Sequence, residues 1–121
     1  MYNLPHTMKN KEKLRKRFLR DPLPIRLGGL AATLARISSS ARQSSDPAQV
    51  ASLLDEAKHL IEWTAADTDP EIAAELVAMQ RLIVLWQKAW VKTEATTEQR
   101  TLLATQAKQW SDQTLGFSGL I

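Results

Sequence analysis

The sequence predicts an all-α fold: an up-and-down antiparallel four-helix bundle preceded by a basic N-terminal arm. Apolar residues recur at three- and four-residue spacing, which is the period of a helix. Alternating strand patterns are missing, and the four glycines fall in two clusters. The expected connections are short, so successive helices should pack antiparallel. We therefore divide the chain into an arm over residues 1–21, helical or partly disordered, and a bundle over residues 22–121.

The first two expected helices cover residues 23–42 and 47–66, with a Ser-rich stretch between them. The inward stripe of the first is Leu23, Leu27, Leu30, Leu34, Ile37 and Ala41. The inward stripe of the second is Val50, Leu54, Ala57, Ile61 and Ala65. Asp46 should cap the second helix, with Pro47 at its first position and Gln49 completing a capping box.

Small residues in the first helix predict a close helix contact. Gly28 and Gly29 are followed by Ala31, Ala32 and Ala35, and each glycine inside a helix costs roughly 1 kcal/mol relative to alanine. Close approach of another backbone would offset that cost. No strand precedes the glycines and no G-x-G-x-x-G motif is present, so we expect no phosphate-binding loop.

The third and fourth helices have clear start signals. Asp69 followed by Pro70 predicts a helix that runs to about Lys92, and Thr96 with Gln99 predicts a capping box at the start of the last helix. The last helix should carry Leu103, Ala107, Trp110 and Thr114 inward and fray before the segment GFSGLI.

The third helix carries two apolar stripes. One is Ile72, Leu76, Met79, Ile83, Trp86 and Trp90, and the other is Ala78, Leu82, Leu85 and Ala89. A helix that is apolar nearly all round requires burial on most of its circumference. Either the arm or the C-terminal tail covers the second stripe, so that all of it is intramolecular core, or a second subunit does. Trp63, on the flank of the second helix, favours an interface, where tryptophan is enriched. The predicted interface residues are Trp63, Leu82, Leu85, Trp86 and Trp90.

Positive charge is concentrated in the arm. Eight basic and two acidic side chains give residues 1–26 a net charge of +6, and eight basic and eleven acidic side chains give residues 27–121 a net charge of −3. The basic contact residues expected in the arm are Lys9, Lys11, Lys13, Arg15, Lys16, Arg17 and Arg20. Any electrostatic attraction to a partner is therefore local to the arm.

Three interpretations of the arm remain open. Its cations could neutralise nucleic-acid phosphates, with Phe18 and Tyr2 stacking on bases. A helical arm with Leu14 and Phe18 on one edge could dock weakly on a membrane or an acidic partner. Alternatively, Leu14, Phe18 and Leu19 pack on the bundle of the same chain, or on the acidic body of a neighbouring molecule, and the lysines stay in water.

The residue types argue against catalysis, metal binding and a bound cofactor. The chain has no cysteine, which removes thiol nucleophiles and thiolate ligands and fits a reducing compartment. The pair Glu56 and His59 has the Glu-x-x-His spacing of di-iron bundles, but that site needs the motif twice. No serine is aimed at a base by its spacing. We expect a non-enzymatic protein with no catalytic, cofactor-binding or metal-binding residues.

No apolar run approaches the ~18 residues that a bilayer span needs, and the first residues lack the apolar core of a secretory signal. These features predict a cytoplasmic protein. The segments PIRLGGLAATLARISS, LLDEAKHLIEWTA, AAELVAMQRLIVLWQKAW and WSDQTLGFSGL resemble a group of small uncharacterised proteins found in cyanobacteria. The resemblance covers roughly residues 22–120 and implies a cytoplasmic or near-thylakoid setting, with no activity attached.

The function predicted is protein–protein contact, mainly self-association into a dimer through the third helix. The alternative is a nucleic-acid-binding module that uses the basic arm.

Overall fold

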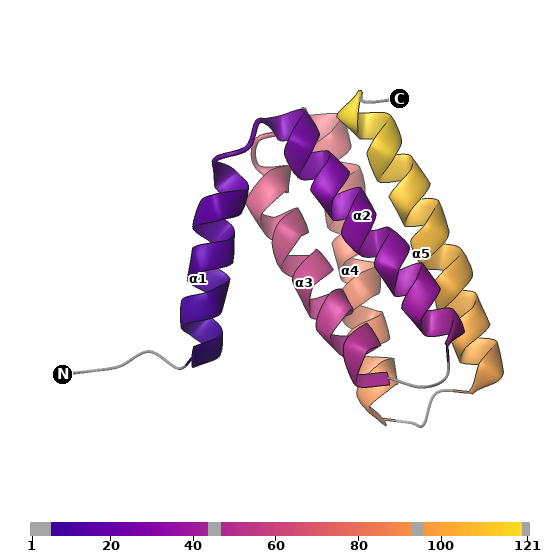
Figure 1. The fold of residues 1–121 in the computed structure, drawn as a ribbon. Helices are drawn as coiled ribbons and strands as arrows, with labels where there is room; N and C mark the ends of the chain where they lie inside the picture. The colour runs from indigo at the N-terminus through magenta and orange to yellow at the C-terminus, as the bar shows by residue number, and fades with distance from the viewer. Residues whose placement is uncertain (1–5, 44–46, 93–95, 120–121) are drawn as a thin grey trace.

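The computed structural model describes residues 6–43, 47–92 and 96–119. Within these ranges the chain forms five helices and no strand: α1 His6–Leu19, α2 Leu23–Arg42, α3 Pro47–Ala65, α4 Pro70–Lys92 and α5 Thr97–Ser118. Figure 1 shows α2 to α5 lying alongside one another with alternating direction, while α1 stands to one side. The prediction of an all-α fold is confirmed. Five helices are found where four and an arm were expected, because most of the arm is itself a helix.

The start of α5 follows its predicted capping box. The Thr96 hydroxyl accepts a hydrogen bond from the Gln99 amide, and the Gln99 side chain accepts one from the Thr96 amide, both at 3.1 Å. The predicted fraying before GFSGLI is wrong, since α5 continues through Gly116 to Ser118. It ends at Gly119, whose left-handed φ of 71° suits a residue without a Cβ. The predicted cap at Asp46 lies outside the described residues.

The core is built from the stripes that the helical period predicted. In α2 and α3, Leu30, Leu34, Ile37, Leu54 and Ile61 are fully buried, and α4 and α5 add Leu76, Ile83 and Leu103. Burial of each such side chain contributes roughly 1.5–3 kcal/mol of transfer free energy. This set excludes the second apolar stripe of α4.

The closest helix pair is α2 with α5, and two serines join it reciprocally. Ser38 of α2 donates to the carbonyl of Ala104 at 2.7 Å, and Ser111 of α5 donates to the carbonyl of Ala31 at 2.8 Å. A side-chain hydroxyl reaches a neighbouring helix backbone only where the axes are close, which small residues permit. The close contact predicted for this part of α2 is therefore present at Ala31. Gly29 instead lies on the exposed side of α2, next to Phe18 of α1.

Because α5 is held against α2, it meets α4 over much less of its length. Near the C-terminal end of α5, Gln113 donates to Glu75 at 3.3 Å and the Thr114 hydroxyl lies 4.0 Å from the Met79 sulfur. Toward the other end of α5 the space between the two helices is an open groove, described below. The bundle is thus asymmetric, tight on the α2 side of α5 and open on the α4 side.

Candidate functional site

The second apolar stripe of α4 faces solvent. Leu82 is 40 % exposed and Leu85 is 59 % exposed, while Ala78 and Ala89 on the same face are also exposed. The interpretation in which this stripe is intramolecular core is therefore wrong for the described chain. The stripe is available to a partner, and the aliphatic side chains on it gain free energy when water is removed from them.

This stripe forms one wall of a groove between α4 and α5, which we call the α4–α5 groove. Its volume is about 370 Å³, and its lining residues are Leu82, Leu85, Trp86, Ala89, Gln99 and Leu102. Leu102 comes from α5 and is 61 % exposed. The only polar side chain among them is Gln99, whose carbonyl oxygen is engaged in the capping box of α5. The groove is suited to apolar side chains.

Leu85 stands on the ridge between this groove and a second hollow. The second hollow has a volume of about 330 Å³ and is lined by Gln80, Arg81, Val84 and Leu85. A protruding leucine with a depression on each side has the shape of a knob beside two holes, which is how helices interlock. The exposed surface of α4 thus presents one protruding leucine between two hollows.

Charge changes sign along the exposed side of α4. Glu71 and Glu75 are exposed in the first part of the helix, whereas the exposed cations are Arg81, directly before Leu82, and Lys88, after the leucines. If two copies of α4 pair antiparallel across the leucines, the acidic half of one helix lies near the basic half of the other. Such a pattern is self-complementary under a two-fold axis.

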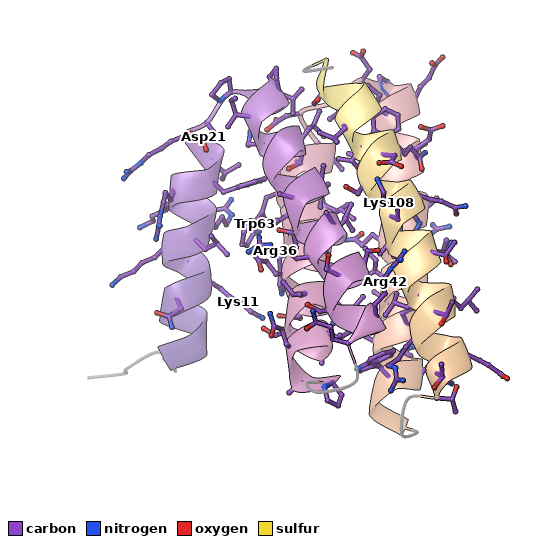
Figure 2. All side chains as sticks on the ribbon, turned by 45° about the vertical axis from the view of Figure 1, so that its right-hand side comes forward. Lys11, Asp21, Arg36, Arg42, Trp63 and Lys108 are labelled. Atoms are coloured by element: carbon purple, nitrogen blue, oxygen red, sulfur yellow. The ribbon has the colours of Figure 1, made fainter. Side chains whose placement is uncertain are left out.

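The structure separates the five predicted interface residues into three places. Leu82, Leu85 and Trp86 line the α4–α5 groove together. Trp90 is in the core with 9 % exposure, and its indole nitrogen donates to the carbonyl of Pro47 at 3.0 Å. Trp63 is half-buried beneath α1 on a different side of the molecule (Figure 2). Only the first three share a surface.

Leu102 was missed by the sequence reasoning. It is adjacent to Leu103, and a helix can point only one of two consecutive leucines at the core. The helical period assigned Leu103 to the core, where it is fully buried. That assignment places Leu102 on the exposed side of the helix, so the sequence could have indicated Leu102 as a candidate contact residue.

The arm docks on α3 and does not cover the second stripe of α4. The ring of Phe18 lies 6.1 Å from that of Trp63, and Trp63 stacks on His59 at 5.8 Å. Leu14 and Leu19 are half-buried. The packing of α1 on its own chain is thus present, but the expectation that it covers α4 is wrong.

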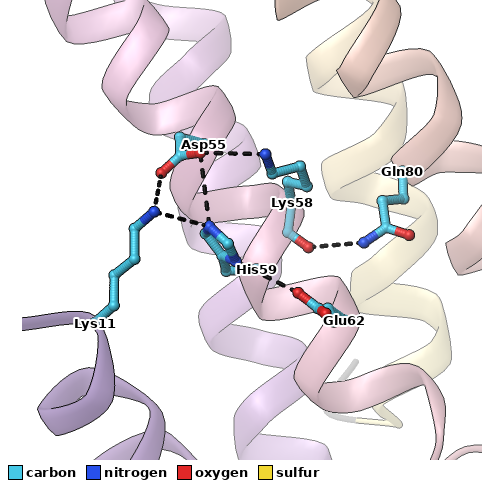
Figure 3. A network of polar contacts seen from close by, with 6 residues as sticks. All are labelled: Lys11, Asp55, Lys58, His59, Glu62 and Gln80. Atoms are coloured by element: carbon cyan, nitrogen blue, oxygen red, sulfur yellow. Dashed lines mark hydrogen bonds and ion pairs between the residues drawn. The ribbon is translucent and has the colours of Figure 1, made fainter. Parts of the chain in front are cut away.

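A polar network fixes the other end of the α1–α3 contact (Figure 3). The Lys11 ammonium lies 3.1 Å from the carboxylate of Asp55 and 3.0 Å from the Nε2 atom of His59. The Nδ1 atom of the same ring lies 3.4 Å from the carboxylate of Glu62. His59 therefore contacts Lys11 of the arm and two carboxylates of its own helix, Asp55 and Glu62.

Asp55 is held in its charged form by this network. Burial is the largest single influence and acts to raise the pKa of Asp55, but it is outweighed by the sum of the hydrogen bond from Lys11, the charges of His59 and Lys11, and a hydrogen bond from Lys58. The result is a pKa below the usual value. The ion pair with Lys11 thus remains intact across the neutral range.

The corner between α1 and α2 is tied to the far end of α3. Arg26, which is buried, donates to the carbonyl of Asp21 at 3.1 Å and to the carboxylate of Asp67 at 2.9 Å. A buried guanidinium needs such partners because an unpaired charge in the interior is costly. Arg26 therefore sets where α1 leaves the bundle.

The remaining cations of the arm lie on the side of α1 away from α3. A shallow hollow of about 290 Å³ is lined by Lys13, Lys16, Arg17 and Arg20, which we call the basic face of α1. On a helix at 100° per residue, Lys13 and Lys16 lie opposite Lys11, Leu14 and Phe18, and Arg17 lies on the flank about 60° from Leu14. Arg20 follows the last residue of the helix. Arg15 instead lies 3.9 Å from Glu12, and the side chain of Lys9 lies outside the described part.

Two further findings bear on function. No helix within the described ranges is long and apolar enough to cross a membrane. Among the same residues, no group of three or more histidine and carboxylate side chains is placed to hold a metal ion. No family model, curated protein or solved structure matches this chain, so the resemblance to cyanobacterial proteins stays a prediction.

Proposed function

We propose that this chain is a non-enzymatic assembly protein, in which α2 to α5 act as a four-helix bundle that pairs with a second copy of itself through α4 and the α4–α5 groove. The observation that carries the proposal is the exposure of Leu82, Leu85 and Leu102 around one apolar groove. Isolated exposed leucines are ordinary, but a contiguous apolar surface of this kind marks an interaction site.

A second copy is the occupant that the surface fits best. Leu85 protrudes between two hollows, so a two-fold arrangement places the leucine of each copy into a hollow of the other. The sign change from Glu75 to Lys88 supports an antiparallel pairing of the two α4 helices. Trp86, at the edge of the groove, supplies the aromatic anchor that such interfaces favour. The absence of cysteine fits the proposed cytoplasmic setting.

The test is the molar mass of the full chain by light scattering behind a sizing column. The wild type should be a dimer, and Leu85→Glu should weaken the dimer by about tenfold or more, since it places two like charges near the two-fold axis. Leu85 is more than half exposed, so the variant should keep its helical circular dichroism. Ile25→Glu is a matched control, because Ile25 is 48 % exposed and does not line the groove.

The geometry can be tested separately by cross-linking, since the chain has no cysteine of its own. Cysteine placed singly at Ala78, Leu82, Leu85 and Ala89 should give an oxidised dimer at the position nearest the axis, where the two Cα atoms approach to about 4.4–6.8 Å. Cysteine placed at Ile25 should give no oxidised dimer. A monomeric wild type, or a dimer indifferent to Leu85→Glu and cross-linked at none of the four positions, would overturn the proposal.

A further inference from the structure

The basic face of α1 is the strongest charged surface that the proposed self-association does not use. Lys13, Lys16, Arg17 and Arg20 line one hollow and form no ion pair with another residue of the described ranges. All four are exposed. Like charges held this close repel one another, and the repulsion is relieved when a polyanion binds. We propose that this face binds the phosphate backbone of a nucleic acid.

The dimensions of the face fit a phosphate strand. From Lys13 to its last residue, Leu19, the helix rises about 9 Å at 1.5 Å per residue, and Arg20 follows directly. Along one strand of a duplex the phosphates are spaced about 3.4 Å apart on the axis, so the face spans about three spacings, which correspond to about four phosphates. Arginine and lysine bind phosphate oxygens by charge-assisted hydrogen bonds without reading bases. The expected binding is therefore independent of sequence.

The structure favours nucleic acid over a membrane because the apolar edge of α1 is already occupied. Phe18 packs on Trp63 and lies against Gly29, and Lys11 is held by Asp55. An amphipathic helix binds a bilayer by inserting its apolar side, which α1 in this position does not present. The side of α1 that remains exposed is cationic.

The placement of α1 keeps the polyanion away from the acidic remainder of the chain. Figure 1 shows α1 standing apart from α4 and α5, and Figure 2 shows nitrogen-tipped side chains of α1 extending away from the other helices. The network around Lys11 and the stacking of Phe18 hold the helix with its basic face outward. Docking on α3 thus orients the contact surface.

The test is fluorescence anisotropy of a labelled duplex oligonucleotide and a labelled single strand, titrated with the full chain at several salt concentrations. Four phosphate contacts predict that the logarithm of the association constant falls with the logarithm of salt with a slope of about −3 to −4 for the duplex, and about −3 for the single strand. The double variant Arg17→Glu with Arg20→Glu should weaken binding at least tenfold and reduce the slope by about half.

The double variant Arg42→Glu with Lys108→Glu is the control, since it makes the same change in net charge on other helices (Figure 2). It should leave most of the affinity and the slope intact. Equal loss in both variants would mean non-specific attraction to net charge, and would overturn the assignment to this face. Absence of oligonucleotide binding at low salt would overturn the proposal, and binding to phosphatidylserine vesicles in its place would assign the face to a membrane. Self-association is measured by light scattering and nucleic-acid binding by anisotropy. Failure of one proposal is therefore distinguishable from failure of the other.

Discussion

Leu85 of α4 and Leu102 of α5 line the same groove although each is more than half exposed. Among the neighbouring pairs of α2 to α5, α4 and α5 meet over the shortest length, because Ser111 and Ala104 of α5 hold that helix against α2. The groove therefore exists because α5 packs closely against α2 on one side and only partly against α4 on the other. These two exposed leucines form the centre of the proposed dimer contact.

The first prediction concerns Leu102, which the proposed dimer buries from the α5 side. Leu102→Glu should shift the full chain toward monomer, while the free energy of unfolding of the monomer should change by no more than about 0.5 kcal/mol, as is usual for an exposed site. Light scattering and urea unfolding at low protein concentration measure the two quantities. A variant that remains a dimer would place the interface on α4 alone.

The second prediction concerns Gly29, which lies on the exposed side of α2 with Phe18 nearby. A Cβ built there would lie 3.7 Å from the Phe18 ring, an ordinary contact distance, so Gly29→Ala should raise the free energy of unfolding by about 0.4–1 kcal/mol. Urea unfolding followed by circular dichroism measures it.

Gly119 provides the contrasting variant. Its φ is 71°, a conformation that costs an alanine about 1–2 kcal/mol, so Gly119→Ala should lower the stability and not raise it. If Gly29→Ala were destabilising, the packing of Phe18 above α2 would have to be tighter than the structure shows.

The third prediction concerns Thr64, whose buried hydroxyl has no hydrogen-bond partner among the described residues. Thr64→Val replaces that hydroxyl by a methyl group of similar size and should stabilise the protein by about 1 kcal/mol, since it removes an unsatisfied polar group. Ser38→Ala is the comparison, because its hydroxyl is bonded to Ala104 and its loss should cost about 1 kcal/mol. Thermal and urea unfolding of the two variants should therefore shift in opposite directions.

The fourth prediction concerns the pH dependence of the α1–α3 contact. The folded pKa of Asp55 is lowered, so its contribution to stability is present above the ordinary pKa of an aspartic acid and is lost as the pH falls through the lower folded value. The groups facing Asp55 are Lys11 from α1, and Lys58 and His59 from its own helix.

Asp55→Asn should therefore be less stable than the wild type at neutral pH, and the difference should shrink once the pH falls below that ordinary value. Urea unfolding of both chains across the acidic range measures it. A difference that stays constant with pH would show that Asp55 acts through packing and not through its charge.

Much of the fold could be read from the sequence because it depends on local chemistry. The capping box at Thr96, the Asp69–Pro70 start and the buried stripe from Leu27 to Ala41 each follow from residues within a turn or two of one another. The same local reasoning recognised two stripes on α4 and left open what covers the second. The end of α5 was misplaced because Gly116 reads as a helix breaker, whereas packing of Phe117 against the core carries the helix past it.

The sequence by itself determined that the chain is helical, where most helices begin, and that its positive charge lies at one end. The tertiary structure decided which faces meet. It put Trp90 in the core, placed Trp63 beneath α1, exposed Leu102, and turned Lys13 and Arg20 outward while Lys11 turned in. Helix signals act over a few residues, whereas the choice of neighbour depends on whether surfaces far apart in the chain fit together, as the reciprocal serines of α2 and α5 do.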